Sequence, residues 1–205
     1  MAAALSARRL LAMLAHLLSN RWDELRRLRL CVMEAPHRDH IHDLRVACRR
    51  LRAAIGLLVP LLGPAKVRRL EKPIRTITRA LGTVRNLDEA HSFLLTLHDE
   101  GLMPLAAALQ DERQRELRRC QRQLQELPCK RLERQLAKAS AQLVAPQSSP
   151  DDFIGWLSHH DQDLYRPIRR LLRRKKLAAL PAERHRLRIA LKKWRYFNEL
   201  LALLL

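Results

Sequence analysis

Apolar side chains recur every three or four residues along almost the whole chain, which is the spacing that gives an α-helix one buried face. Leu, Ala, Arg, Gln and Glu dominate, β-branched residues are sparse, and only five glycines occur among 205 residues. This amino-acid composition favours helix over sheet. The pattern therefore predicts an all-α protein, with helical segments over residues 6–33, 40–62, 73–99, 104–127, 130–144, 151–176 and 181–205.

Prolines refine the predicted boundaries. Pro73, Pro104 and Pro181 are expected in the first turn of their helices, where the missing amide hydrogen breaks no hydrogen bond. Pro167 falls inside a predicted helix and is expected to kink or split it. Residues 146–150 form the most loop-like stretch of the chain.

An internal repeat indicates two related halves. Residues 42–52 and 185–195 both read H-x-L-R-[VI]-A-x-[RK]-[RK]-x-R, at a constant offset of 143 residues. Such self-similarity is typical of a duplicated structural unit. We therefore expect one domain over residues 1–205, built from two pseudo-repeated helical bundles, with a first half of about 1–145 and a second of about 151–205.

The first repeat carries a column of cations. At about 100° per residue, the side chains of His42, Arg45, Arg49 and Arg52 fall within an arc of about 80°, and no acid lies on that arc. We call these four residues the first basic ridge. The opposite arc is apolar and is expected to be buried: Leu44, Ala47, Cys48, Leu51, Ile55, Leu58 and Leu62.

The second repeat has the same spacing, so His185, Arg188, Lys192 and Arg195 form a second basic ridge. Two matched ridges imply two matched binding surfaces, or one surface built by both. A row of like charges repels itself, and an extended phosphate chain would relieve that repulsion through charge-assisted bonds. A solvated basic face is the alternative. The expected apolar backing of this ridge is Leu187, Ala190, Leu191, Trp194 and Leu201.

The overall charge points to an anionic partner. Forty Lys and Arg stand against 21 Asp and Glu, a formal net charge of +19. Nucleic acid, an anionic membrane surface and polyphosphate all fit that excess. The four cysteines have no C-x-x-C spacing, so we interpret them as reduced residues of a cytoplasmic protein. No apolar stretch is long enough for a transmembrane segment.

At the ridges the sequence resembles the CHAD domain, a family named for conserved histidines in an α-helical domain. Its two signatures look like H-x-L-R-V-x-x-R-R-L-R and H-x-L-R-I-x-x-K-x-x-R-Y-x-x-E, and they match residues 42–52 and 185–199. A third element, L-G-x-x-R-D-x-D, matches residues 81–88 except that Asn86 replaces the first Asp.

The resemblance implies two related helical bundles with a basic groove or cavity, and binding of inorganic polyphosphate by the signature cations. Those cations include Arg50 and Lys193 beside the two ridges, and Arg85 by its place in the third element. Arg79, about a turn and a half earlier, is a further candidate. An association with polyphosphate granules in the cytoplasm is the expected location.

This chain departs from the family pattern at its end. The family continues past the second signature, whereas the sequence stops at residues 201–205, a run of Leu and Ala. We therefore expect an incomplete second bundle. The chain is either truncated or covered there by a partner chain, which leaves a homodimer as an alternative.

Catalysis is not expected. Hydrolysis of polyphosphate would need metal-holding carboxylates or a placed acid and base, and the sequence contains neither these on the ridges nor a P-loop or an H-E-x-x-H motif. We predict no metal and no cofactor. A nucleic-acid-binding protein is the main rival, although aromatics are only 4% and do not interleave the ridges. A scaffold that docks an acidic protein partner is the other rival.

Overall fold

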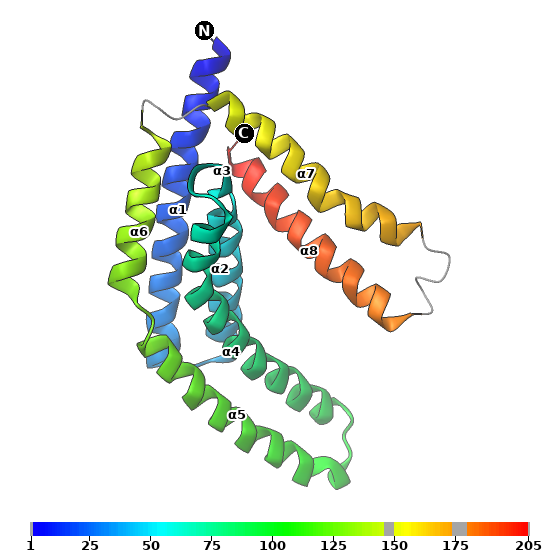
Figure 1. Ribbon diagram of the computed structural model, residues 1–205. Helices are drawn as coiled ribbons and strands as arrows, with labels where there is room; N and C mark the ends of the chain where they lie inside the picture. The colour runs from blue at the N-terminus through cyan, green and yellow to red at the C-terminus, as the bar shows by residue number, and fades with distance from the viewer. Residues whose placement is uncertain (1, 146–149, 174–179, 205) are drawn as a thin grey trace. The chain divides into compact units, whose positions relative to one another are not determined.

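The computed structural model describes residues 2–145, 150–173 and 180–204. It confirms the all-α prediction, since the described residues form helices and turns with no strand. Figure 1 shows the elements in chain order. They are α1 (Ala2–Glu34), α2 (Arg38–Gly56), α3 (Val59–Leu62), α4 (Pro64–Thr96), the 3₁₀-helix η1 (Glu100–Leu102), α5 (Met103–Gln125), α6 (Cys129–Leu143), α7 (Pro150–Leu172) and α8 (Pro181–Leu204).

The helix boundaries correct the sequence prediction at Pro73 and decide one part of it at Pro167. The helix expected to begin at Pro73 begins instead at Pro64, and Pro73 lies inside it. Gly63 explains the difference, because its φ of 76° is left-handed and separates α3 from α4. Pro167 lies inside α7, which continues to Leu172, so the helix is not split. The starts at Pro104 and Pro181 are confirmed within one residue.

The chain forms two compact units whose segments alternate along the sequence. Unit 1 contains residues 1–18, 53–67 and 136–205, and unit 2 contains residues 19–52 and 68–135. Helices α1, α2, α4 and α6 each run from one unit into the other, and the two sequential halves that we expected stay a prediction. That the chain forms a single domain stays a prediction.

Unit 2 has a leucine-rich interior. Burying each such side chain contributes roughly 1.5–3 kcal/mol. Beyond this core, α4 and α5 form an antiparallel hairpin closed by η1, visible at the lower right of Figure 1. The largest fully buried side chains of this unit are Leu25, Ile41, Leu44, Leu51, Ile74, Leu81 and Leu124.

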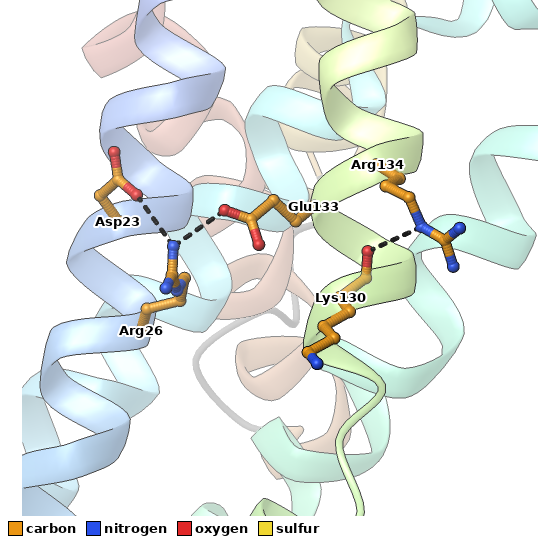
Figure 2. Close-up of polar contacts among 5 residues, drawn as sticks. All are labelled: Asp23, Arg26, Lys130, Glu133 and Arg134. Carbon is orange, nitrogen blue, oxygen red and sulfur yellow. Dashed lines mark hydrogen bonds and ion pairs between the residues drawn. The ribbon is translucent and has the colours of Figure 1, made fainter.

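An exposed ion pair joins α1 to α6 in unit 2 (Figure 2). Arg26 Nη1 lies 2.9 Å from Glu133 Oε1 and 3.8 Å from Asp23 Oδ1. Next to them, Arg134 Nε donates to the carbonyl oxygen of Lys130 at 3.3 Å. The side chains of Arg26 and Glu133 are about half exposed, so this pair stabilises the unit little.

In unit 1, α7 and α8 pack as an antiparallel pair (Figure 1). His160 stacks on Trp156, with ring centroids 4.6 Å apart, and its edge meets the ring of Phe197. Trp194 Nε1 donates to Asp161 Oδ1 at 2.9 Å. The His160–Phe197 edge contact and the partly buried Trp194–Asp161 hydrogen bond cross between the two helices and therefore help to fix their register.

Within the described residues, no helix has an 18-residue window apolar enough to cross a membrane.

Candidate polyanion-binding surfaces

The first basic ridge lies in unit 2 along α2. His42 is exposed, while Arg45, Arg49 and Arg52 are partly exposed. The burial predicted for the opposite face is confirmed, because every residue predicted there is buried except Leu62, which is partly exposed. The fully buried residues on that face include Leu44, Ala47, Cys48, Leu51, Ile55 and Leu58.

Arg45 reaches across to α4 at a glycine. A Cβ added to Gly82 would lie 3.5 Å from Arg45 Nε and 4.0 Å from its Nη2. The guanidinium therefore lies over Gly82, in the space that a side chain longer than Ala would need. Among the described residues, Arg45 Nε is buried from solvent and has no hydrogen-bond partner.

Arg52, one end of the ridge, has the same unsatisfied Nε. It lies near Glu71 and Arg75 of α4. Burial raises the pKa of the Glu71 carboxyl, and the positive charges of Arg52 and Arg75 partly offset that rise. An acid therefore stands close to this end of the ridge, contrary to the acid-free surface that the sequence led us to expect. Arg75 was not among the predicted residues, although its i+4 spacing to Arg79 could have suggested it.

Arg85 projects from α4 and is mostly buried. Its Nε lies 3.2 Å from Glu89 Oε1, an ion-pair distance, but the alignment does not make a hydrogen bond. Glu89 therefore supplies a carboxylate that Asn86 cannot, and Asn86 is exposed. Arg79, on the same helix, is exposed.

Asp88 was not considered in the sequence analysis beyond its place in the third element. It is buried, and it accepts a hydrogen bond from Arg113 Nε of α5. Arg113 Nη2 also donates to the carbonyl oxygen of Pro36 at 3.5 Å. This pair ties α4 to α5 and to the start of α2. No local pattern could reveal it, because Asp88 and Arg113 are 25 residues apart.

Arg50 leaves the first ridge and turns toward α1. Its Nη1 lies 3.8 Å from Glu24 Oε1, and Glu24 also accepts a hydrogen bond from Arg21 at 2.8 Å. Arg50 is therefore partly engaged within the protein.

The second basic ridge lies in unit 1 along α8. His185, Arg188 and Arg195 are exposed and Lys192 is partly exposed. His42 and His185 each occupy the fifth position of their helix, so the sequence repeat is also a repeat of helix position. Lys193 is exposed beside this ridge.

The apolar backing predicted for this ridge is wrong. Leu191 is 42% exposed, and Leu187, Ala190, Trp194 and Leu201 are only partly buried. Apolar residues surround most of α8, so periodicity alone did not single out one buried arc. Packing against α7 determines which face of α8 is buried. The buried residues of α8 are Glu183, Tyr196, Phe197, Leu200 and Leu204.

A shallow hollow of about 290 Å³ lies along the free face of α8. We call it the α8 hollow. Two leucines and four cations line it, three of them from the second ridge. Its lining is Arg184, Leu187, Arg188, Leu191, Lys192 and Arg195.

An acid, Glu199, stands beside the end of the second ridge. Arg195 Nε lies 3.2 Å from Glu199 Oε1, and its guanidinium carbon lies 5.0 Å from the centre of the Tyr196 ring. The ion pair is exposed, so it is weak and exchangeable. The expectation that the ridges lack acids therefore fails at the end of each ridge, where Glu71 and Glu199 stand.

The described residues contain no group of three or more His, Cys, Asp and Glu side chains that could hold a metal ion. The four cysteines are unpaired, and burial raises the pKa of Cys48 and of Cys120 to about 12. These two thiols therefore behave as small apolar core groups at neutral pH.

Comparisons with known proteins agree with the signatures. A model of the CHAD domain family matches residues 8–205. Among solved structures, the chain is similar to the crystal structure of the CHAD domain from the plant Ricinus communis, with a TM-score of 0.73 and 26% sequence identity. That alignment covers 93% of this chain but 65% of the other, so this chain spans less than two thirds of its length. No curated protein matches.

Proposed function

Because this chain belongs to the CHAD domain family, we propose that it binds inorganic polyphosphate without hydrolysing it. The binding groups in this proposal are the two basic ridges, extended on α4 by Arg79 and Arg85. Arg50 and Lys193 flank the ridges and add positive charge.

One observation carries the proposal: the Nε atoms of Arg45 and Arg52 are sheltered from solvent and have no acceptor among the described residues. A buried donor left without a partner costs roughly 1–3 kcal/mol. Proteins seldom retain that cost on two cations of one helix face unless a ligand supplies the acceptors. The bridging and terminal oxygens of a phosphate chain are such acceptors, and they also neutralise the charge.

The spacing of the cations supports a linear ligand. Residues three or four apart on a helix follow one another along its axis, at about 5 Å per turn. Arg45, Arg49 and Arg52 therefore offer successive cations in a row rather than one cluster. A flexible chain of phosphates can place successive anions along such a row.

Nearby acids set the strength of the proposed contacts. Glu71, Glu89 and Glu199 each stand close to a ridge or to Arg85, and an incoming phosphate must compete with them. Two of the pairs involve exposed carboxylates, which cost little to displace. The contacts of the second ridge should therefore depend on salt more strongly than those of Arg45, because salt screens a partly buried charge less.

We propose binding without turnover because the ridge faces present guanidinium, ammonium and imidazole groups. Metal-assisted hydrolysis uses several carboxylates held around one phosphate. The acids near these ridges stand singly and are each engaged with an arginine. The proposed setting is the cytoplasm, at the surface of polyphosphate granules, where unpaired cysteines such as those of this chain stay reduced.

Isothermal titration calorimetry with size-defined polyphosphate tests the proposal, with heparin, duplex DNA and an acidic polypeptide as competitors. Long polyphosphate should displace DNA at a much lower phosphate concentration than the reverse. Preferential binding of DNA would favour a nucleic-acid-binding protein, and preferential binding of the polypeptide would favour a protein scaffold.

A pair of double variants separates site binding from diffuse attraction. Replacing Arg45 and Arg188 with Gln should weaken polyphosphate binding far more than replacing Arg169 and Arg170 of α7, which are exposed cations outside both ridges. The two double variants remove the same charge. Equal losses would mean that net charge alone drives binding, and the proposal would be withdrawn.

A further inference from the structure

A segment in the middle of this basic chain carries no Lys or Arg. Residues 86–112 contain none, although the whole sequence has 40, and they include six acids. The segment forms the outer part of the α4–α5 hairpin around η1 (Figure 1). Such local reversal of charge in a protein of net charge +19 marks a surface with a different partner from the ridges.

The end of this hairpin is apolar as well as acidic. We call residues 93–105 the acidic tip. Its large apolar side chains face solvent, and Phe93 is the most open of them at 62% exposure. Together they present on the order of 400 Å² of apolar surface, as much as a typical monomer shows in its largest patch. The exposed apolar residues of the tip are Phe93, Leu95, Leu97, Met103 and Leu105.

The acids of the tip remain available to a partner molecule. Asp99 accepts a hydrogen bond from the backbone N–H of Gly101 at 2.8 Å, which holds the turn, and it stays exposed. Glu100 is exposed and makes no ion pair with another described residue. Among the described residues, cations meet the hairpin next to the tip, where Arg38 donates a hydrogen bond to Ser92 at 2.6 Å, and further toward its base, where Arg85 meets Glu89 and Arg113 meets Asp88.

The α8 hollow has the complementary character. Its lining combines Leu187 and Leu191 with four cations. At about 290 Å³ it is at the lower limit of small-molecule pockets, a size that suits one large apolar side chain flanked by acids. The acidic tip combines exposed apolar side chains with acids, and the α8 hollow combines leucines with cations, so the two surfaces are complementary in charge and in apolar character.

We propose that the acidic tip of one copy docks on the α8 hollow of a second copy. Phe93 enters between Leu187 and Leu191, and Glu100 lies against the cations of the second ridge. The contact joins two different surfaces, so it is head-to-tail and extends to chains or rings rather than closing on itself as a two-fold dimer does. A contact of this size belongs to the small, weak and transient class of protein–protein interfaces.

A consequence of this contact rests on the proposed function. The tip and polyphosphate would use the same cations of α8, so they would compete. Polyphosphate would then release copies from one another, and self-association would mask the second ridge until the polyanion arrives.

Sedimentation velocity of the full chain, without any polyanion, tests the docking itself. The wild-type protein should associate between about 1 and 200 µM, and more weakly as salt rises. A tip variant, Phe93→Ser with Glu100→Lys, should remain monomeric, as should a hollow variant, Arg188→Glu with Leu191→Ser. Circular dichroism should show wild-type helix content for both, since every replaced side chain is exposed.

Mixing the two variants gives the sharpest result. The tip variant keeps an intact hollow and the hollow variant keeps an intact tip, so the mixture should form a 1:1 complex and nothing larger. Matched controls are Leu30→Ser on α1 and Arg170→Glu on α7, both exposed and both expected to associate like the wild type.

Three outcomes would overturn the docking. The first is a wild type that is still monomeric at about 200 µM, where a weak contact should form. The second is self-association of either variant at the wild-type level. The third is a mixture of the two variants that stays monomeric. Because these measurements contain no polyphosphate, they leave the proposed function untouched. Adding polyphosphate then tests the competition: loss of association supports it, and unchanged association in a protein that binds polyphosphate refutes it.

Discussion

Replacing Arg45 with Met separates a ligand-binding arginine from a structural one. Met keeps an apolar stem of similar reach but removes the guanidinium, including the buried Nε that has no acceptor. Relieving an unpartnered donor returns roughly 1 kcal/mol, and a shift of that size raises the melting temperature of a chain this long by about 2–4 °C. We therefore expect the unliganded variant to be as stable as the wild type or slightly more stable.

Polyphosphate binding should change in the opposite direction. A charge-assisted hydrogen bond contributes roughly 1.5–3 kcal/mol, so losing the contact at Arg45 should weaken binding by about tenfold or more. The slope of log affinity against log salt should also fall by about one charge. Calorimetry with size-defined polyphosphate at several salt concentrations and thermal melts without ligand measure the two effects.

Arg113→Met is the matched control. Arg113 donates to the buried Asp88, and its loss would leave that carboxylate uncompensated in the core. Breaking a buried pair in this way costs about 3 kcal/mol, which lowers the melting temperature by roughly 6–12 °C. If Arg45→Met were destabilised like Arg113→Met and still bound polyphosphate normally, Arg45 would be a structural residue and our reasoning would fail.

Three further predictions follow from single contacts. Glu71→Gln should tighten polyphosphate binding by about two- to fivefold, because it removes a competing carboxylate. It should also raise stability at neutral pH, because burial raises the pKa of Glu71 and the ionised carboxylate opposes folding above that pKa. Unchanged affinity in calorimetry and an unchanged melting temperature would contradict these two expectations. Burial lowers the pKa of His160 below its ordinary 6.5, so its contribution to stability should be complete above pH 6.5 and decrease as the pH falls below it. Thermal melts at pH 7.5 and 5.5 measure this loss of stability. The loss should be smaller in His160→Gln and unchanged in the exposed His159→Gln. Gly82→Ala should stabilise α4 by about 0.5 kcal/mol and keep affinity, because its Cβ meets Arg45 at ordinary contact distance, whereas Gly82→Leu should displace that side chain and cost about tenfold in binding.

Residues of α2 show how far a local pattern can go. One helix face carries all the cations of the first ridge, and the other is uniformly apolar, so periodicity predicted both the ridge and the burial behind it. On α8 the apolar residues occupy most of the circumference, and the same method predicted the wrong buried arc. A pattern identifies a face only when one arc is clearly polar.

The ion pairs show a second limit. Arg195 with Glu199 and Arg85 with Glu89 are four residues apart, so they could have been predicted from helical spacing. Arg113 with Asp88 and Trp194 with Asp161 join different helices. Such pairs depend on which helices become neighbours, and the chain's local composition does not specify that.

The sequence by itself determined the helical class, the repeat of cations at equal helix positions and the family signatures, because each depends on spacing within one helix. Only the tertiary structure decided which face of α8 is buried, and that Arg45 lies over Gly82 with its Nε unsatisfied. Those features arise when distant segments pack, and the burial that results sets which cations are screened, which are paired and which remain for a ligand.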